Sequence, residues 1–371
     1  MTATLWDTNG AEIVHALAEQ RRAAGALASG LALTLVVVVE EKHVVDAQAA
    51  ATYAAAAHPC RVLVVVRRRL DAEDRLDAEV QVGGVVGANE CVVMRMYGRL
   101  TLHAESVVLP LLASDAPVVT WWYGPPPERL AHDALGVLAG RRITDCVAAE
   151  DPRAELKGRA KDYAPGDTDL AWTRATPWRA LLASAFDGSE AEPTSAEVHA
   201  EAINPSAPLV AGWLSTRLGI KARVVDSAGP GITAVEVRFA DKSRVRIDRP
   251  DGHQATLSRT GRPDRSLPLK RRDLGELIAE ELRRLDADQP YAEALAAATR
   301  TKGLNERPAK RTHVWKDPEP LTAKVRSAAT GARATAKKAA AKSSGAAGRA
   351  KKKKDEPAGR TRASAGAKTS K

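Results

Sequence analysis

Two apolar runs on either side of an alanine-rich segment constrain the fold of this chain more than any other feature. Leu31–Val39 and Arg61–Val66 are rich in β-branched residues, a composition typical of strands that are covered on both faces. Val44–Ala57, between them, has the composition of a helix and ends before Pro59, because the residue before a proline disfavours helical geometry. A strand, a helix and a strand in this order predict a parallel pair in an α/β sheet.

The alternation continues along the first half of the chain. A helix interrupted near Pro110 and a helix beginning near Pro127 are expected, and Gly83–Gly87 is expected to be a turn in a hairpin. We therefore predict an α/β domain with a mostly parallel, doubly wound sheet. Four further segments have the apolar or alternating pattern of its strands: Ala78–Val82, Cys91–Tyr97, 118–122 and Arg141–Val147.

A helical connector is predicted over Asp151–Pro208. Within it, Thr176 is expected to be an N-cap and Pro177 the first helical residue. Ser189–Ser195 has the composition of a linker. The apolar residues that follow Thr176 have helical spacing, so Trp178 is expected to anchor the helix in a core: Trp178, Leu181, Leu182, Ala185 and Phe186.

The last third predicts a smaller α+β domain. A helix is expected to end at Gly219 in a left-handed cap. Alternating residues over 235–247, with turns at Ala240–Ser243 and Asp251–Gly252, predict an antiparallel meander with one polar face. A helix over Leu274–Leu285 is expected to cover the apolar face of this meander. The predicted domains are 1–188, 189–300 and a linker with tail over 301–371.

The charge of the chain is concentrated at its C-terminal end. Residues 321–371 contain 15 Lys/Arg and two acidic residues, a net charge of +13, whereas the whole chain carries +10. The other 320 residues therefore carry −3. The tail has almost no large apolar residue, so we expect it to be disordered. We expect the tail either to keep the protein soluble or to bind nucleic acid or another polyanion weakly.

Motifs for catalysis, metals and cofactors are missing from the sequence. It contains no C-x-x-C, H-E-x-x-H or phosphate loop, and Gly83–Gly87 lacks the glycine spacing of a dinucleotide site. We therefore expect no catalytic residue, no metal and no cofactor. The longest apolar run is too short to span a bilayer, and no secretory signal is evident, so the predicted location is cytoplasmic.

The three cysteines leave two interpretations open. Cys60, Cys91 and Cys146 are widely spaced and odd in number, which argues against a disulfide framework. Each lies at or in a predicted strand, where a thiol behaves as a small inert apolar group. A redox-sensing role is the alternative.

Tryptophan and arginine gather in one part of the chain. Six of its 14 aromatic residues fall within the 58 residues from Trp121 to Trp178. Tryptophan with arginine is the composition of protein interfaces, although the same residues can also stack on each other within a fold. The predicted partner-binding residues are Trp121, Trp122, Arg129, Trp172, Arg174 and Arg179.

Long strings in this region resemble a known family. "RMYGRLTLHAESVVLPLL", "APVVTWWYGPPPERL", "DTDLAWTRATPWRALLASAF" and "AGWLSTRLG" are similar, in this order, to the glucose-6-phosphate dehydrogenase assembly protein (OpcA) family. The likeness runs from about Ala24 to about Ala298. It implies a non-catalytic partner that promotes assembly and activation of glucose-6-phosphate dehydrogenase, and it implies redox control in photosynthetic relatives.

Two other classes of function remain as alternatives. An α/β sheet can hold a small ligand at the carboxyl ends of its strands, so the chain could be an enzyme or a sensor of sugar phosphates. Its basic tail could instead make it a protein associated with nucleic acid or other polyanions.

Overall fold

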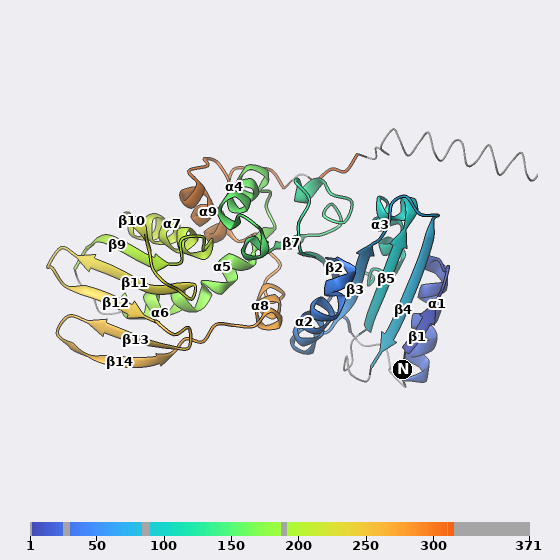
Figure 1. Ribbon diagram of the computed structural model, residues 1–371, viewed down its shortest axis with the longest axis horizontal. Coiled ribbons are helices and arrows are strands. Elements are labelled where there is room, and N and C mark those ends of the chain that lie inside the picture. The colour runs from blue at the N-terminus through green and yellow to red at the C-terminus, as the bar shows by residue number, and fades with distance from the viewer. Residues whose placement is uncertain (1, 25–29, 84–89, 187–190, 310, 315–371) are drawn as a thin grey trace, which may run out of the picture. The chain divides into compact units, whose positions relative to one another are not determined.

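The computed structural model describes residues 2–24, 30–83, 90–186, 191–309 and 311–314. Met1–Val314 form one compact unit that contains two sheets (Figure 1). The second unit, Trp315–Lys371, lies outside the described residues. The predicted disorder of the tail concerns these residues and stays a prediction. The domain boundaries at 188 and 300 stay a prediction.

The first sheet has eight strands in the order β1-β4-β5-β3-β2-β6-β7-β8. From β5 to β8 all neighbours are parallel, and β1 and β4 extend this part as antiparallel strands. The predicted parallel-rich α/β sheet is thus confirmed. Its strands are β1 (Thr2–Leu5), β2 (Leu33–Val39), β3 (Cys60–Arg67), β4 (Arg75–Val82), β5 (Glu90–Tyr97), β6 (Val118–Tyr123), β7 (Arg141–Thr144) and β8 (Asp167–Asp169).

The strand order reverses in the middle of this sheet. The chain proceeds outward from β2 through β3 to β5 and then returns to place β6 on the other side of β2. The carboxyl ends of β2 and β6 are therefore neighbours. After β2 the chain continues to β3 on one side of the sheet, and after β6 it continues to β7 on the other side. Such a switch point is where open α/β sheets form ligand crevices.

Apolar clusters cover both faces of the first sheet. Successive residues of a strand point to opposite faces, so Leu35 and Val37 join one cluster and Val36 joins the other. Each is fully buried, which stabilises the fold by about 1.5–3 kcal/mol per side chain. Helices α2 (Val44–Ala57) and α8 (Leu274–Glu281) contribute to the first cluster, and α1 (Gly10–Ala23) and α3 (Ala104–Val108) contribute to the second.

The second sheet has six strands in the order β10-β9-β11-β12-β13-β14. Strands β11 to β14 form the predicted antiparallel meander. Gly219 ends α7 (Ser206–Leu218) with a φ of 66°, as predicted. The strands are β9 (Pro193–Ala200), β10 (Lys221–Asp226), β11 (Ile232–Phe239), β12 (Arg244–Asp248), β13 (Gln254–Arg259) and β14 (Arg262–Pro268).

The prediction for α8 was wrong. This helix packs side by side with α2 of the first sheet, where Leu277 and Ile278 are buried, instead of covering the meander (Figure 1). The contact is close, because a Cβ on Gly275 would lie 2.8 Å from the Tyr53 side chain. The apolar face of the meander is covered by α7 and by α6 (Thr176–Phe186), which leaves no apolar surface there for α8.

Three local predictions also need correction. The predicted linker is partly strand, because β9 begins at Pro193 and pairs with β10 and β11, while 187–190 lie outside the described residues. No helix begins near Pro127; a short 3-10 turn at Leu130–His132 takes its place. Thr176 is the first residue of α6, and its hydroxyl accepts a hydrogen bond from Arg179.

The remaining helices lie between and after the sheets. The predicted helical connector contains α4 (Pro152–Asp162) and α5 (Leu170–Arg174), separated by strand β8. Helix α9 (Gln289–Thr299) packs on α7 so closely that a Cβ on Gly212 would lie 2.5 Å from the Ala294 carbonyl oxygen. Beyond α9, the end of the described chain contacts the segment after β6, where Arg311 donates to the Ala139 carbonyl oxygen and Thr312 and His313 bond to His132.

Candidate functional site

A cleft lies at the switch point of the first sheet. Residues at or just after the carboxyl ends of β2, β6 and β7, together with Arg174 at the end of α5, surround a hollow of about 460 Å³, which we call the switch-point cleft. Its position follows from the strand order, because neighbouring parallel strands end at the same edge. It is lined mainly by Glu40, Lys42, His43, Trp121, Trp122, Tyr123, Asp145 and Arg174.

Aromatic side chains form one wall of the switch-point cleft. Trp121 and Trp122 are 1% and 2% exposed, and the ring of Tyr123 contacts Trp121 edge-on and His43 at a tilt. The indole Nε1 atoms of both tryptophans are buried without a hydrogen-bond partner among the described residues. Because both nitrogens are buried and successive residues of β6 point to opposite faces of the sheet, the wall offers a ligand mainly apolar aromatic surface.

The charged groups of the switch-point cleft are paired. Arg174 donates two hydrogen bonds of 2.7 Å to the two carboxylate oxygens of Asp145. Burial opposes the charge of Arg174, but its hydrogen bonds to Asp145 outweigh burial, so its pKa lies above the ordinary value. Lys42 lies 3.0 Å from Glu40. Pairing leaves little net charge in the cleft.

The turn after β2 does not fit a dinucleotide. A pyrophosphate requires glycines here so that backbone N–H groups can approach it. The turn between Val39 and Val44 contains no glycine and carries Glu40 and Glu41, whose carboxylates would repel phosphate. Gly83 follows β4 in the antiparallel pair with β5, as the hairpin prediction requires, and residues 84–89 lie outside the described residues.

Arginines at the end of β3 do not compensate for this turn. Three consecutive arginines in that position could in principle hold a phosphate of a cofactor. Each is paired with a carboxylate of the chain instead: Arg67 with Asp133, Arg68 with Glu41 and Arg69 with Asp71. The described residues of this crevice thus offer no cradle for the phosphates of a dinucleotide.

The six predicted partner-binding residues differ in accessibility. Trp172 is 1% exposed, like Trp121 and Trp122, and its Nε1 donates to Asp288. The guanidinium of Arg179 lies 3.5 Å from the centre of the Trp172 ring, so this pair stacks within the fold. The side chain of Arg129 is 63% exposed. The contact of these residues with a partner stays a prediction, for which Arg129 and the exposed quarter of Arg174 are accessible.

All three cysteines are buried. Burial raises the pKa of the Cys60 thiol and of the Cys91 thiol to about 12, and it raises the pKa of Cys146 as well. A thiol of raised pKa is protonated at neutral pH and reacts slowly. The redox role of these residues stays a prediction, and their burial does not favour it.

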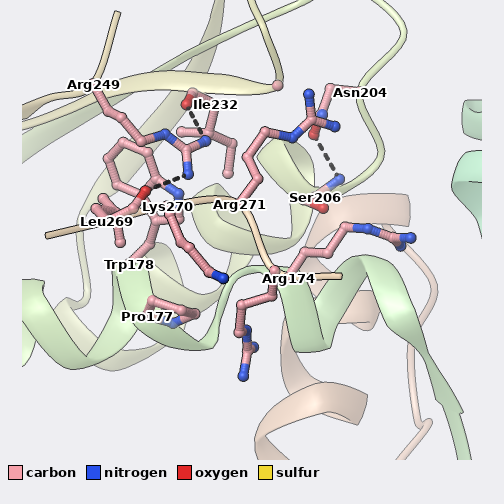
Figure 2. Close-up of a pocket in the computed structure, with 12 residues that line it drawn as sticks. Arg174, Pro177, Trp178, Asn204, Ser206, Ile232, Arg249, Leu269, Lys270 and Arg271 are labelled. Atoms are coloured by element: carbon pink, nitrogen blue, oxygen red, sulfur yellow. Dashed lines mark hydrogen bonds between the residues drawn. The ribbon is translucent and has the colours of Figure 1, made fainter. Parts of the chain in front are cut away.

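A second hollow, which sequence reasoning missed, lies beside the second sheet (Figure 2). We call it the basic pocket. The run Lys270, Arg271 and Arg272 in the sequence was a signal for it, but the other members come from distant segments. Its polar and charged lining residues are Arg174, Asn204, Ser206, Arg249, Lys270, Arg271 and Arg272.

Trp178 supports this pocket from the core. It is 1% exposed and belongs to the cluster under the meander, as predicted. The guanidinium of Arg249 lies 4.9 Å from the centre of its ring. Arg249 donates to the carbonyl oxygens of Leu269 and Ile232 at 3.1 and 2.9 Å, which fixes its position (Figure 2).

The residues that the structure describes contain no group of three or more His, Cys, Asp or Glu side chains placed to hold a metal ion. No described helix is long and apolar enough to cross a membrane.

Solved structures with a similar course of the chain are oxidoreductases. KijD10, a 3-ketoreductase from Actinomadura kijaniata in complex with NADP and TDP-benzene, is 11% identical with a TM-score of 0.40, covering 77% of this chain and 99% of that one. An NAD binding oxidoreductase from Klebsiella pneumoniae is 12% identical with a TM-score of 0.39, covering 78% and 100%. Similarity at this level carries no functional argument.

Family models identify the chain more directly. The model described as the glucose-6-phosphate dehydrogenase subunit N-terminal domain matches residues 51–161, and the one described as its C-terminal domain matches residues 165–295. A comparison with curated protein sequences gives no match. Because the two models follow each other and together span most of the described chain, this protein belongs to the glucose-6-phosphate dehydrogenase assembly protein (OpcA) family.

Proposed function

We propose that this protein is a non-catalytic assembly factor and activator that binds glucose-6-phosphate dehydrogenase and favours its active oligomer. The observation that carries the proposal is the match of both family models, whose descriptions name a subunit of that enzyme. The turn after β2 supports the non-catalytic part, because its two glutamates replace the glycines that a dinucleotide requires.

Activation by assembly has a thermodynamic requirement. The protein must bind the active form of the dehydrogenase more tightly than the inactive form, since equal affinity shifts no equilibrium. A tenfold preference corresponds to about 1.4 kcal/mol. A few well-placed contacts supply this difference.

The proposed contact surface includes Arg129 and Arg174. Arg129 is largely exposed, and its nearest carboxylate, Asp162, lies 3.7 Å away. Arg174 lines both the switch-point cleft and the basic pocket. The guanidinium of Arg129 can hydrogen-bond to a carboxylate of the partner in a bidentate manner, whereas Arg174, which is held by Asp145, offers its remaining N–H groups.

The central test measures dehydrogenase activity and mass. Adding the full chain to its cognate dehydrogenase should raise the activity and shift the mass distribution in size-exclusion chromatography with light scattering. An unrelated dehydrogenase serves as the control. Unchanged activity and mass, with both proteins at concentrations on the order of micromolar, would contradict the proposal.

Arg174→Ala tests the proposed surface. The variant should bind the dehydrogenase about tenfold more weakly, the effect of losing a charged interface contact of about 1.4 kcal/mol. It should remain folded, although its free energy of unfolding should fall by about 1–3 kcal/mol because Asp145 loses its partner. Arg262→Ala, on the exposed strand β14, is the matched control. Parental affinity in Arg174→Ala would place the interface elsewhere.

A further inference from the structure

The basic pocket concentrates positive charge. Of its lining residues, five are cationic and none is acidic. Three of the five have a carboxylate partner outside the lining: Arg174 pairs with Asp145, Arg272 with Glu280 and Lys270, at 3.7 Å, with Glu276. Arg249 and Arg271 have no carboxylate within 4.0 Å among the described residues.

Of these two arginines without a carboxylate partner, Arg249 is the buried one. It is 5% exposed, and its Nε has no hydrogen-bond partner among the described residues. Burial lowers its pKa, and repulsion from Arg271 lowers it further. Asp251 counteracts this in part, but an oxygen of its carboxylate already accepts the backbone N–H groups of His253 and Gln254. The hydrogen bonds of Arg249 to Leu269 and Ile232 and its stacking on Trp178 offset part of the cost of burying this cation, and a bound anion would offset more of it.

The N-terminus of α7 contributes the second element. Asn204 Oδ1 accepts the backbone N–H groups of Ser206 and Ala207 at 2.9 and 3.1 Å (Figure 2 shows the bond to Ser206). The hydroxyl of Ser206, a residue that is 3% exposed, has no partner among the described residues. The positive end of this 13-residue helix favours a negative charge at the same place.

The three residues Ser206, Arg249 and Arg271 come from separate parts of the fold. Ser206 begins a helix, Arg249 follows β12, and Arg271 follows β14. The hollow they line has a volume of about 70 Å³, little more than the share of two water molecules at about 30 Å³ each. It suits a single oxyanion group rather than a nucleotide, which needs a pocket of several hundred Å³.

We propose that the basic pocket binds the phosphoryl group of a small phosphorylated molecule, with Ser206 Oγ as a hydrogen-bond donor and with Arg249 and Arg271 as the positive charges that attract it. A phosphoryl group carries nearly two negative charges and three acceptor oxygens, which match two unpaired guanidinium groups and a hydroxyl better than a carboxylate does. The phosphoryl group comes either from inorganic phosphate or from a phosphate ester, whose organic part then lies outside the hollow.

Calorimetric titration of the full chain tests this proposal. Inorganic phosphate and glucose 6-phosphate are the two probes, each at constant ionic strength. Both should bind if the pocket recognises the phosphoryl group alone, and tighter binding of glucose 6-phosphate would identify a phosphate ester as the ligand. No binding of either probe at millimolar concentration would overturn the proposal.

Two variants assign the binding to this pocket. Ser206→Ala and Arg271→Gln should each weaken phosphate binding by about tenfold, the effect of one charge-assisted hydrogen bond. The side chains of Ser206 and Arg271 make no hydrogen bond to other described residues. Both variants should therefore have the melting temperature of the parent protein. Arg265→Gln, an exposed arginine of β14 outside the pocket, is the control of equal charge.

If Arg265→Gln weakened phosphate binding as much as the pocket variants do, the binding would reflect general charge attraction and the proposal would be overturned. Unchanged phosphate affinity in both pocket variants would place the binding elsewhere and would overturn it as well. The experiment contains no dehydrogenase, and Arg174 is left intact. Its failure would therefore leave the proposed assembly function untouched, and a failed assembly experiment would leave the pocket untouched.

Discussion

The two sheets of this protein bury their faces in different ways. The first sheet has apolar clusters on both faces, whereas the second has helices on one face and ion pairs on the other, where Glu236 accepts hydrogen bonds from Arg238 and Arg246. The hollows beside them differ accordingly. The switch-point cleft of the first sheet is aromatic with paired charges, and the basic pocket beside the second sheet has unpaired cations.

This difference shows that position in a fold does not determine the chemistry of a site. The switch point is the customary place for a nucleotide. In this chain its carboxylates and paired arginines disfavour phosphate, and the donors suited to phosphate lie at the start of α7 instead. The distribution of unpaired charge, rather than strand order, indicates where an anion would bind.

Trp178→Ala should have the largest effect, because it removes the support of the second sheet and of the basic pocket together. Truncating a fully buried tryptophan leaves a cavity that costs about 3–5 kcal/mol. Urea unfolding monitored by circular dichroism measures the loss. Trp178→Phe keeps most of the volume and should cost less. A loss below 1 kcal/mol, roughly the effect of a surface change, would show that the second sheet does not depend on this residue.

Gly275→Ala should test the packing of α8 on α2. Alanine by itself favours a helix, so any loss of stability in this variant must come from the contact with α2. The new methyl group would lie 2.8 Å from Tyr53, so the free energy of unfolding should fall by about 1–3 kcal/mol. Gly158→Ala in α4 is the matched control, because its Cβ meets nothing within 4 Å. It should stabilise the protein by about 0.5–1 kcal/mol. Changes of the same sign in both variants would argue against the tight packing of α8 on α2.

At alkaline pH, the free energy of unfolding should decrease because the buried thiols of the first sheet resist losing their protons. The pKa of Cys91 is raised from 9.0 to about 12 by burial, so above pH 9 the unfolded chain releases a proton that the native chain still holds. This contribution to stability is present below pH 9 and is lost as pH rises from about 9 to about 12, by at most about 1.4 kcal/mol per pH unit.

Cys91→Ala should therefore show a shallower decline of unfolding free energy with pH than the parent. Val92→Ala, which creates a cavity on the opposite face of β5 without removing a titrating group, is the control. An unchanged slope in Cys91→Ala would mean that the thiol is not protected from water in the native protein.

Deletion of residues 321–371 should have the smallest effect on both sheets. The segment is rich in lysine and alanine and contains almost no large apolar residue that could stabilise a core. The melting temperature and the activation of the dehydrogenase should stay at the level of the full chain. Lower activation by the shortened protein would assign this basic segment to the interface.

Local features of the fold could be predicted because they depend on neighbouring residues. The bounds of α2, Val44–Ala57, match the prediction, as does the left-handed cap at Gly219. The strands of the meander follow from a period of two. The short β8 and the strand β9 were missed, because three polar residues and a polar alternating segment carry little strand signal on their own.

The candidate sites could be predicted only in part. Tryptophan and arginine indicated the region of the switch-point cleft, but composition does not distinguish a buried ring from an exposed one. The sequence therefore left partner contact and stacking within the fold open, and the structure buries Trp121, Trp122 and Trp172. The basic pocket was missed because Ser206, Arg249 and Arg271 are far apart in the chain.

The sequence by itself determined the parallel-rich first sheet, the meander and the family, because periodicity, turn residues and long characteristic strings are local. Only the tertiary structure decided which apolar faces meet and which charges remain unpaired. Helix α8 shows the reason: its apolar face could be read from its spacing, but the hydrophobic effect has no direction. The choice of α2 over the meander depended on which surface was still uncovered and close enough for Gly275 to approach Tyr53.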